Sequence, residues 1–254
     1  MTRRLVVVYD VDGPRVRIGC LWFGAVISAL LLGRGALAFL YAAVAGVAGL
    51  QAARGWRRAG RHPHRPAAGV LAATLPIAAA VSTLVLGGAL LALAGTAYYL
   101  ALVAGHRGSL PVIDAGYTVQ CALFPGMAAA GLVLSHRFET GAAVALVLMV
   151  SAYESGDYLI GSGARFAIEG PLAGALAILV VTFGVSAVGV NPFEFPTAFG
   201  FGALAAVLCP LGQLLGSAIL PSAAAPAPAL RRLDSLLVLA PAWAWLVGAY
   251  AAGP

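Results

Sequence analysis

Three short segments carry the residues whose types and spacing could support chemistry. The first, residues 153–170, contains the carboxylates of Glu154, Asp157 and Glu169 and the guanidinium of Arg165. Glu154 and Asp157 are three residues apart, so they share one face if a helix continues through them. Carboxylates beside apolar sequence are costly without a cation, a hydrogen-bond network or water, which favours a functional site. An ordinary charged loop between two helices is the structural alternative.

The second segment, residues 209–217, interrupts an apolar run with Pro210, three small residues and Gln213. Gln213 and Ser217 are four residues apart, so on a helix they point the same way. Such a polar pair can contact a ligand. Taken alone, however, the segment favours helix packing through small residues, with an interhelical hydrogen bond from the glutamine.

The third segment places Arg231, Arg232, Asp234 and Ser235 directly before the last apolar run. An Asp or Ser at such a place is a helix N-cap signal. The paired arginines are either anchors at the membrane surface or a clamp for a phosphate, because arginine binds phosphate through two parallel hydrogen bonds.

A weaker candidate is the arginine-rich stretch 54–65, which also contains Trp56, His62 and His64. We interpret this stretch as a basic loop that lies on anionic lipid headgroups. A His-x-His pair can bind a metal ion, but a metal site needs further ligands and the neighbouring sequence offers no third one.

The elements that must position these residues are membrane-spanning helices. Of the 254 residues, 61% are hydrophobic and only 9% are charged, whereas about a quarter of the residues in a soluble domain are charged. This composition excludes a soluble enzyme and predicts an all-α, polytopic integral membrane protein. The net charge of +6 is typical of membrane proteins that contact anionic lipids, and we expect no nucleic acid partner.

The apolar runs predict about nine spans, since a membrane-spanning helix needs roughly 20 apolar residues. The uncharged block 67–105 is too long for one span and fits two, with a tight turn near Gly87 and Gly88. We expect the run at 141–153 to continue to Tyr158. The remaining runs are 18–32, 35–53, 116–134, 171–190, 197–220 and 235–252.

The arginines orient these spans. All fifteen basic residues are arginine, and with a cytoplasmic N-terminus thirteen of them face the cytoplasm, while Arg34 and Arg137 lie outside. We therefore expect a multi-pass protein of the plasma membrane whose polar motifs face the cytoplasm. The chain is expected to form a single membrane domain, 1–254, with a cytoplasmic segment 1–17, N-terminal helices 18–140 and a C-terminal half 141–254.

In order and membrane placement, the three segments resemble motifs of the bacterial phosphatidate cytidylyltransferases (CDP-diacylglycerol synthases). That family has an acid-x-Gly-Ala-Tyr element at a helix end and then Lys-Thr-Trp-Glu-Gly, and residues 154–158 and 168–170 are similar. Its Gly-Asp-Leu-x-Glu-Ser and Asp-Arg-x-Asp-Ser elements correspond to residues 212–217 and 231–235. The resemblance covers the chain from about residue 145 to residue 250.

The resemblance implies attack of a lipid phosphate on the α-phosphorus of CTP, with release of pyrophosphate. Such a transfer depends on positioning and on a divalent cation, here Mg²⁺, which neutralises the developing charge. The implied catalytic residues are Glu154, Asp157, Glu169 and Asp234, of which Glu154, Glu169 and Asp234 would bind the metal ion. The implied substrate-binding residues are Arg165, Gln213, Ser217, Arg231 and Arg232.

Several parts depart from the family pattern, and its Lys-Arg and Lys-Asp elements and His-Gly-Gly turn are missing here. Gln213 and Arg231 stand where the family has acids, so one charge is lost and another is reversed at a site for a hard cation. We therefore carry two hypotheses: a divergent cytidylyltransferase, or a non-catalytic relative that binds a membrane phospholipid or a partner membrane protein. A small-molecule transporter is a third hypothesis, for which Gln213 and Pro210 are the only hints. Small residues such as Gly87 and Gly88 are also compatible with a homodimer.

Overall fold

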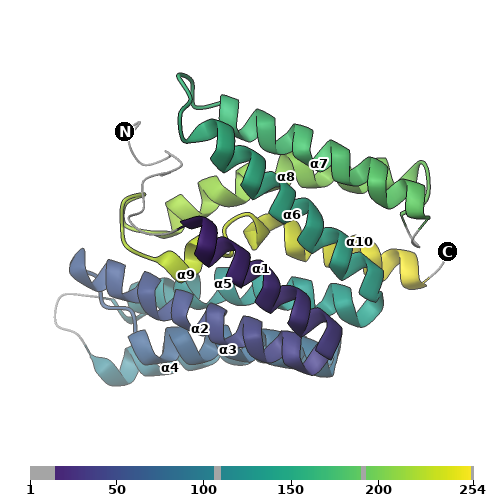
Figure 1. The fold of residues 1–254 in the computed structure, drawn as a ribbon. Helices are drawn as coiled ribbons and strands as arrows, with labels where there is room; N and C mark the ends of the chain where they lie inside the picture. Colours follow the sequence, from purple (N-terminus) through teal and green to yellow (C-terminus); the bar gives the residue numbers. More distant parts are fainter. Residues whose placement is uncertain (1–14, 106–109, 190–192, 253–254) are drawn as a thin grey trace.

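The computed structural model describes residues 15–105, 110–189 and 193–252, and these residues form an all-α bundle (Figure 1). The helices are α1 (Arg15–Leu32), α2 (Arg34–Arg58), α3 (Arg65–Val81), α4 (Thr83–Ala104), α5 (Pro111–Phe138), α6 (Thr140–Gly161), α7 (Glu169–Val188), α8 (Thr197–Ile219), α9 (Pro228–Arg231) and α10 (Leu236–Ala252). Long apolar helices without strands in this part of the chain confirm the predicted fold class.

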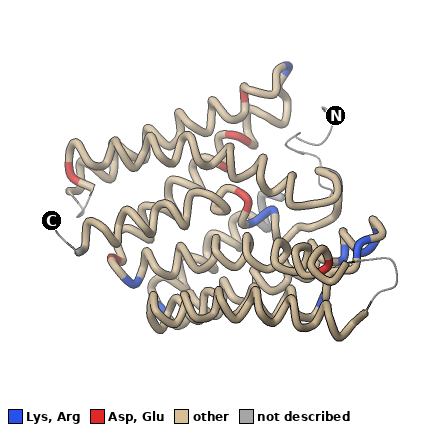
Figure 2. The backbone as a smooth tube through the Cα atoms, turned by 180° about the vertical axis from the view of Figure 1, so that it is seen from behind, with Lys and Arg blue, Asp and Glu red and all other residues tan. Residues whose placement is uncertain are grey.

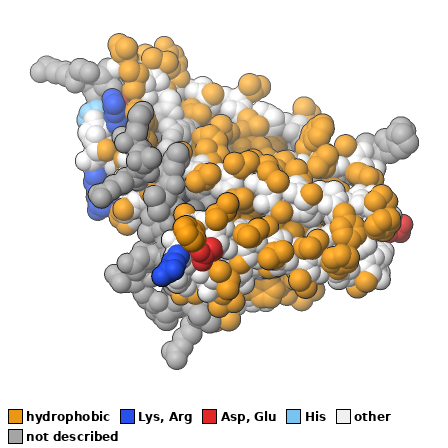
Figure 3. Space-filling model, turned by 90° about the horizontal axis from the view of Figure 1, so that it is seen from above, with side chains coloured by type: hydrophobic (Ala, Val, Ile, Leu, Met, Phe, Trp, Pro, Cys, Tyr) orange, Lys and Arg blue, Asp and Glu red, His pale blue; other side chains and the backbone are white. Residues whose placement is uncertain are grey.

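Six of these helices, α2 and α4 to α8, are long and apolar enough to cross a membrane. Shorter apolar stretches lie in α1, α3 and α10, over Gly19–Leu32, Arg65–Val81 and Leu236–Ala251. The surface agrees with a lipid environment. The side chains of Leu31, Leu84 and Leu91 are 84%, 85% and 79% exposed, and Figure 3 shows apolar side chains across the whole face seen from above. A soluble monomer rarely exposes such extended apolar surface.

The helices pack in two layers around α10 (Figure 1). In one layer α5 contacts α2, α3 and α4; in the other α7 packs against α6 and α8. The helix α10 contacts both α5 and α8 and so joins the two layers. The buried core runs through all of them and includes Leu37, Leu75, Leu132, Leu146 and Trp243.

The boundary between the two helices in the block 67–105 differs from the predicted one. The chain breaks at Ser82, whereas α4 continues through Gly87 and Gly88. Ser82 is extended, and its hydroxyl accepts a hydrogen bond from the backbone N–H of Val85 at 2.9 Å. A serine that caps a helix in this way satisfies a donor that would otherwise lack a partner, so the cap decides the boundary. The predicted turn was wrong in position, but the split into two helices is confirmed.

The other predicted runs agree with the observed helices to within a few residues at each end. The run at 141–153 does continue, because α6 extends to Gly161 and places Glu154 and Asp157 on one helix. Gly156 on the same helix allows α7 to come close: a Cβ atom there would lie 2.8 Å from the carbonyl oxygen of Ala173. The end of α6 is therefore fixed against the start of α7.

One end of the bundle carries most of the described arginines. We call it the arginine-rich end: it is where α2 ends, α3 begins and α8 ends. Figure 2 shows most of the blue segments toward this end. The indole N–H of Trp56 on α2 donates a hydrogen bond to the carbonyl of Ile219 at the end of α8, at 2.7 Å, so the ends of the two helices lie together.

Candidate functional site

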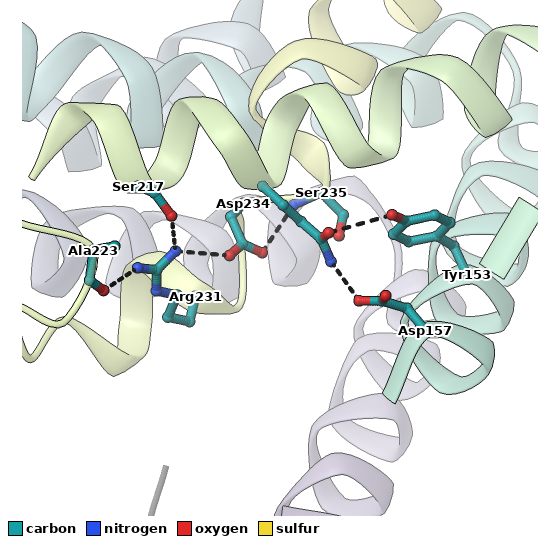
Figure 4. A network of polar contacts seen from close by, with 8 residues as sticks. Tyr153, Asp157, Ser217, Ala223, Arg231, Asp234 and Ser235 are labelled. Atoms are coloured by element: carbon teal, nitrogen blue, oxygen red, sulfur yellow. Dashed lines mark hydrogen bonds and ion pairs between the residues drawn. The ribbon is translucent and has the colours of Figure 1, made fainter. Parts of the chain in front are cut away.

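A buried network of polar side chains joins α6, α8 and the segment before α10 (Figure 4). We call it the polar cluster. Its members are Tyr153, Asp157, Gln213, Ser217, Arg231 and Asp234. In a helix bundle with so few charged residues, a concentration of this kind is the default candidate for function.

The first half of the polar cluster is centred on Gln213. The hydroxyl of Tyr153 donates to the side-chain oxygen of Gln213 at 3.2 Å. The amide nitrogen of Gln213 donates to a carboxylate oxygen of Asp157 at 3.1 Å. All three residues are buried, so the amide uses both of its ends to join α8 to α6. This is the interhelical glutamine bond that residues 209–217 predict on their own.

The second half is centred on the guanidinium of Arg231, which has three partners. One terminal nitrogen donates to the hydroxyl of Ser217 at 3.1 Å and to the carboxylate of Asp234 at 3.4 Å. The other donates to the carbonyl of Ala223 at 2.8 Å. Arg231 therefore fixes the loop after α8 onto both α8 and the start of α10.

Two glycines allow this segment to lie against α8. A Cβ atom on Gly216 would lie 2.8 Å from the Cβ of Asp234, and one on Gly212 would overlap the carbonyl oxygen of Asp234. Because glycine has no Cβ, the backbone around Asp234 approaches the helix closely enough for the Arg231 contacts to form.

Asp234 is an acid in a buried place just before α10. Burial raises the pKa of its carboxyl group to about 6, and the neighbouring Arg231 lowers that pKa without offsetting the effect of burial. The carboxylate also accepts a hydrogen bond from the backbone N–H of Ser235 at 3.0 Å. The contacts of this aspartate are thus local, within one turn of the chain, as the predicted helix-start signal implies.

Glu154 and Arg232 lie beside the polar cluster. They line a small cavity of about 30 Å³ together with Trp22 and Tyr41, which is room for about two water molecules at roughly 10–15 Å³ each. Both residues are half-buried. Unlike Arg231, Arg232 makes no hydrogen bond in the part of the chain that the structure describes, but its positive charge lies near the carboxylate of Glu154.

The structure brings together most of the residues predicted for the site. Asp157, Gln213, Ser217, Arg231 and Asp234 form the polar cluster, and Glu154 and Arg232 border it. Arg165 and Glu169 do not join them. Arg165 is exposed between α6 and α7, and Glu169 accepts a hydrogen bond from the backbone N–H of Phe166 at 3.2 Å, which uses it within its own connection.

The three acids predicted to bind a metal ion do not assemble into a metal site in the part of the chain that the structure describes. Among the described residues, no three His, Cys, Asp or Glu side chains come close enough to hold a metal ion, and Glu154, Glu169 and Asp234 are no exception. The carboxylate of Glu169 accepts a hydrogen bond at the start of α7, and the carboxylate of Asp234 pairs with the guanidinium of Arg231 at 3.4 Å. The residues present do not fit Mg²⁺, which prefers several oxygen ligands in near-octahedral geometry.

Sequence reasoning did not assign a role to Tyr153 or to the carbonyl of Ala223. Tyr153 lies four residues before Asp157, so a helix through both would have placed them on one face. No sequence pattern points to Ala223, because any residue in that loop offers a backbone carbonyl.

The arrangement offers a fixed guanidinium, a second guanidinium without a hydrogen bond among the described residues, and three carboxylates around them. Charge-assisted, two-pronged hydrogen bonding to a phosphate is the chemistry that such an arginine supports best.

In comparisons with known proteins, no protein-family model matches this chain and no curated protein matches its sequence significantly.

Proposed function

We propose that this protein binds the phosphate group of a membrane phospholipid at the cytoplasmic face of the plasma membrane, and that Arg232 contacts the phosphate. The proposal includes nine spans with a cytoplasmic N-terminus. Two arguments support that topology: α1 begins and α10 ends at opposite ends of the bundle (Figure 1), and nine spans with a cytoplasmic N-terminus would put thirteen of the fifteen arginines of the sequence on the cytoplasmic side.

The contrast between two neighbouring arginines carries the proposal. Arg231 has three hydrogen-bond partners, whereas Arg232 has none among the described residues and has the charge of Glu154 nearby in the same cavity. A half-buried guanidinium without hydrogen-bond partners is costly in a membrane protein, and an anion relieves that cost. The phosphate of a lipid headgroup is the anion that every membrane presents at this level.

The polar cluster supports binding over nucleotidyl transfer. At two of the positions where the resembled family has acids, Gln213 bridges Tyr153 to Asp157 and Arg231 pairs with Asp234. Both side chains serve as structural connectors: the guanidinium of Arg231 repels cations, and the side-chain oxygen of Gln213 already accepts a hydrogen bond from Tyr153. At these two positions the chain therefore has residues that hold helices together, in place of acids that could bind a metal ion.

A CTP-dependent transfer onto the lipid phosphate is the second candidate. Its support is that the three resembling segments meet in the folded chain. Asp157 of the first segment bonds to Gln213 of the second, and Ser217 of the second is joined through Arg231 to Asp234 of the third. Turnover of CTP by pure protein with phosphatidic acid and Mg²⁺ would favour this candidate over simple binding.

The test is the amount of phospholipid that the purified full-length protein retains, measured by native mass spectrometry. We expect Arg232→Gln to weaken retention about tenfold, since a hydrogen bond to a charged group contributes roughly 1.5–3 kcal/mol. Arg165→Gln is the matched control, because Arg165 is exposed and lies away from the polar cluster. Chelation of divalent cations should change nothing. Equal retention by wild type and Arg232→Gln would contradict the proposal.

A further inference from the structure

A second cationic cavity lies at the arginine-rich end, away from the polar cluster. Its volume is about 260 Å³, more than ten times the roughly 10–15 Å³ that one water molecule needs. It lies where α2 turns into α3 and is closed by the end of α4 and the start of α5. Its lining includes Arg57, His62, His64, Arg65, Leu100 and Thr118.

Arg65 is the key cation of this cavity. Its Nε atom is buried and has no hydrogen-bond partner among the described residues. Leaving a charged donor buried and unpaired costs more than leaving a neutral one. Arg65 is also the first residue of α3, a helix of 17 residues whose N-terminus favours an anion. An anion in the cavity would satisfy both features.

The walls around Arg65 are held rigidly. The backbone N–H of His64 donates to the hydroxyl of Thr118 at 2.9 Å, and that hydroxyl donates to the carbonyl of Asp114. The Nδ1 atom of His64 accepts from the backbone N–H of Ala67 at 3.2 Å, so the other ring nitrogen carries the proton and acts as a donor. Arg57 adds a second positive charge. The buried Asp114 lies one turn before Thr118 and does not line the cavity.

The remaining wall is apolar and indicates which anion the cavity fits. Leu100, Ala101 and Ala104 close one side. They belong to α4, a helix that is mostly exposed and apolar and so faces lipid. Tyr98 and Tyr99 are exposed on the same helix, as is typical of aromatic residues at the membrane–water interface. Cations beside an apolar wall at this level match a phospholipid, whose charged headgroup adjoins its acyl chains.

We propose that this cavity binds the headgroup phosphate of an anionic phospholipid, held by Arg57 and Arg65, as a second lipid site independent of Arg232. The apolar wall and the lipid-facing helix favour a lipid over a soluble phosphate, which would gain nothing from them. The cluster of arginines around it, seen at the connection from α2 to α3 in Figure 2, also concentrates anionic lipid near the entrance.

The test is the affinity of the full-length protein for phosphatidylglycerol, measured by native mass spectrometry or by lipid-induced thermal stabilisation in a neutral detergent. We expect Arg57→Gln and Arg65→Gln each to weaken the affinity about tenfold. Arg58→Gln is the matched control: Arg58 is adjacent, exposed and at the same helix end, but it does not line the cavity. Its effect should stay within about twofold, because Arg58 makes no contact with the cavity and acts only as a screened surface charge.

Three outcomes would overturn the proposal. If Arg58→Gln weakens binding as much as Arg57→Gln, the attraction is a diffuse surface effect. If phosphatidylcholine binds as well as phosphatidylglycerol, no anionic headgroup is selected. If millimolar inorganic phosphate displaces phosphatidylglycerol, the site takes a soluble anion. Because Arg57 is exposed, Arg57→Gln should fold even if Arg65→Gln does not. Retention that depends on Arg232 is a separate measurement, so either lipid site can fail without the other.

Discussion

The polar cluster and the cavity at the start of α3 use arginine in opposite ways. In the cluster, Arg231 donates hydrogen bonds to Ser217, Ala223 and Asp234 and so has a structural role. In the cavity, Arg65 has a buried nitrogen without a partner, next to about 260 Å³ of open space. The difference teaches that arginines in an apolar bundle divide into those that the protein neutralises itself and those that need an outside anion.

The largest effect should come from breaking the satisfied arginine. We expect Arg231→Gln to lower the free energy of unfolding by about 3 kcal/mol, because it leaves the buried carboxyl of Asp234 without its cation. The measurement is the thermal midpoint of the purified protein in detergent. Arg232→Gln is the control and should cost less than about 1 kcal/mol. Equal losses in the two variants would remove the distinction between the arginines.

A pH titration tests the electrostatics of the same pair. The pKa of Asp234 is about 6 in the folded protein, above its ordinary value of 3.8, mainly because of burial. Since the folded state holds this proton more tightly, the contribution is stabilising below about pH 4 and is lost as the pH rises through 6, by up to about 3 kcal/mol. Asp234→Asn should flatten this part of the stability curve. A curve unchanged by the substitution would contradict the burial effect.

Close packing of α8 can be tested at a single atom. We expect Gly216→Ala to destabilise the protein by about 2 kcal/mol, because the new Cβ would lie 2.8 Å from that of Asp234. Gly87→Ala is the control, since nothing lies within 4 Å of a Cβ there and α4 is continuous. That variant should be slightly stabilised, as alanine favours a helix over glycine. Thermal midpoints in the opposite order would show that the segment can move away from α8.

The smallest effect concerns the glutamine bridge. Tyr153→Phe removes the donor to Gln213 at 3.2 Å but keeps the ring, so we expect a loss of about 1 kcal/mol. Lipid retention should not change, because the bridge is structural. A loss of retention with unchanged stability would instead assign Tyr153 to the lipid site.

Much of the fold follows from the sequence because the apolar runs are long and few charges interrupt them. The spacing of Asp157 on α6, and of Gln213 and Ser217 on α8, also predicted side chains that share a face. The break at Ser82 was missed because Gly87 and Gly88 give a turn signal in the same block. The Ser82 hydroxyl accepts from the backbone N–H of Val85 at the start of α4, and glycine has no side chain that could do so.

The acids predicted to bind a metal ion do not come together among the described residues, for a reason that sequence spacing cannot show. Glu169 bonds to its own loop, and Arg231 reaches Ser217 and Ala223 across the chain reversal after α8. Whether an arginine is already neutralised depends on such contacts between distant segments. For the same reason the sequence could mark the stretch 54–65 as basic but could not separate Arg57 and Arg65, which line a cavity, from Arg58, which does not.

The most direct test of two separate phosphate sites is the number of anionic phospholipids that stay bound in native mass spectrometry. We expect two in the wild type, one in Arg232→Gln, one in Arg57→Gln and none in the double variant. Wild-type lipid numbers in the double variant, or loss of both lipids in either single variant, would contradict the assignment of the unpaired arginines to lipid phosphate.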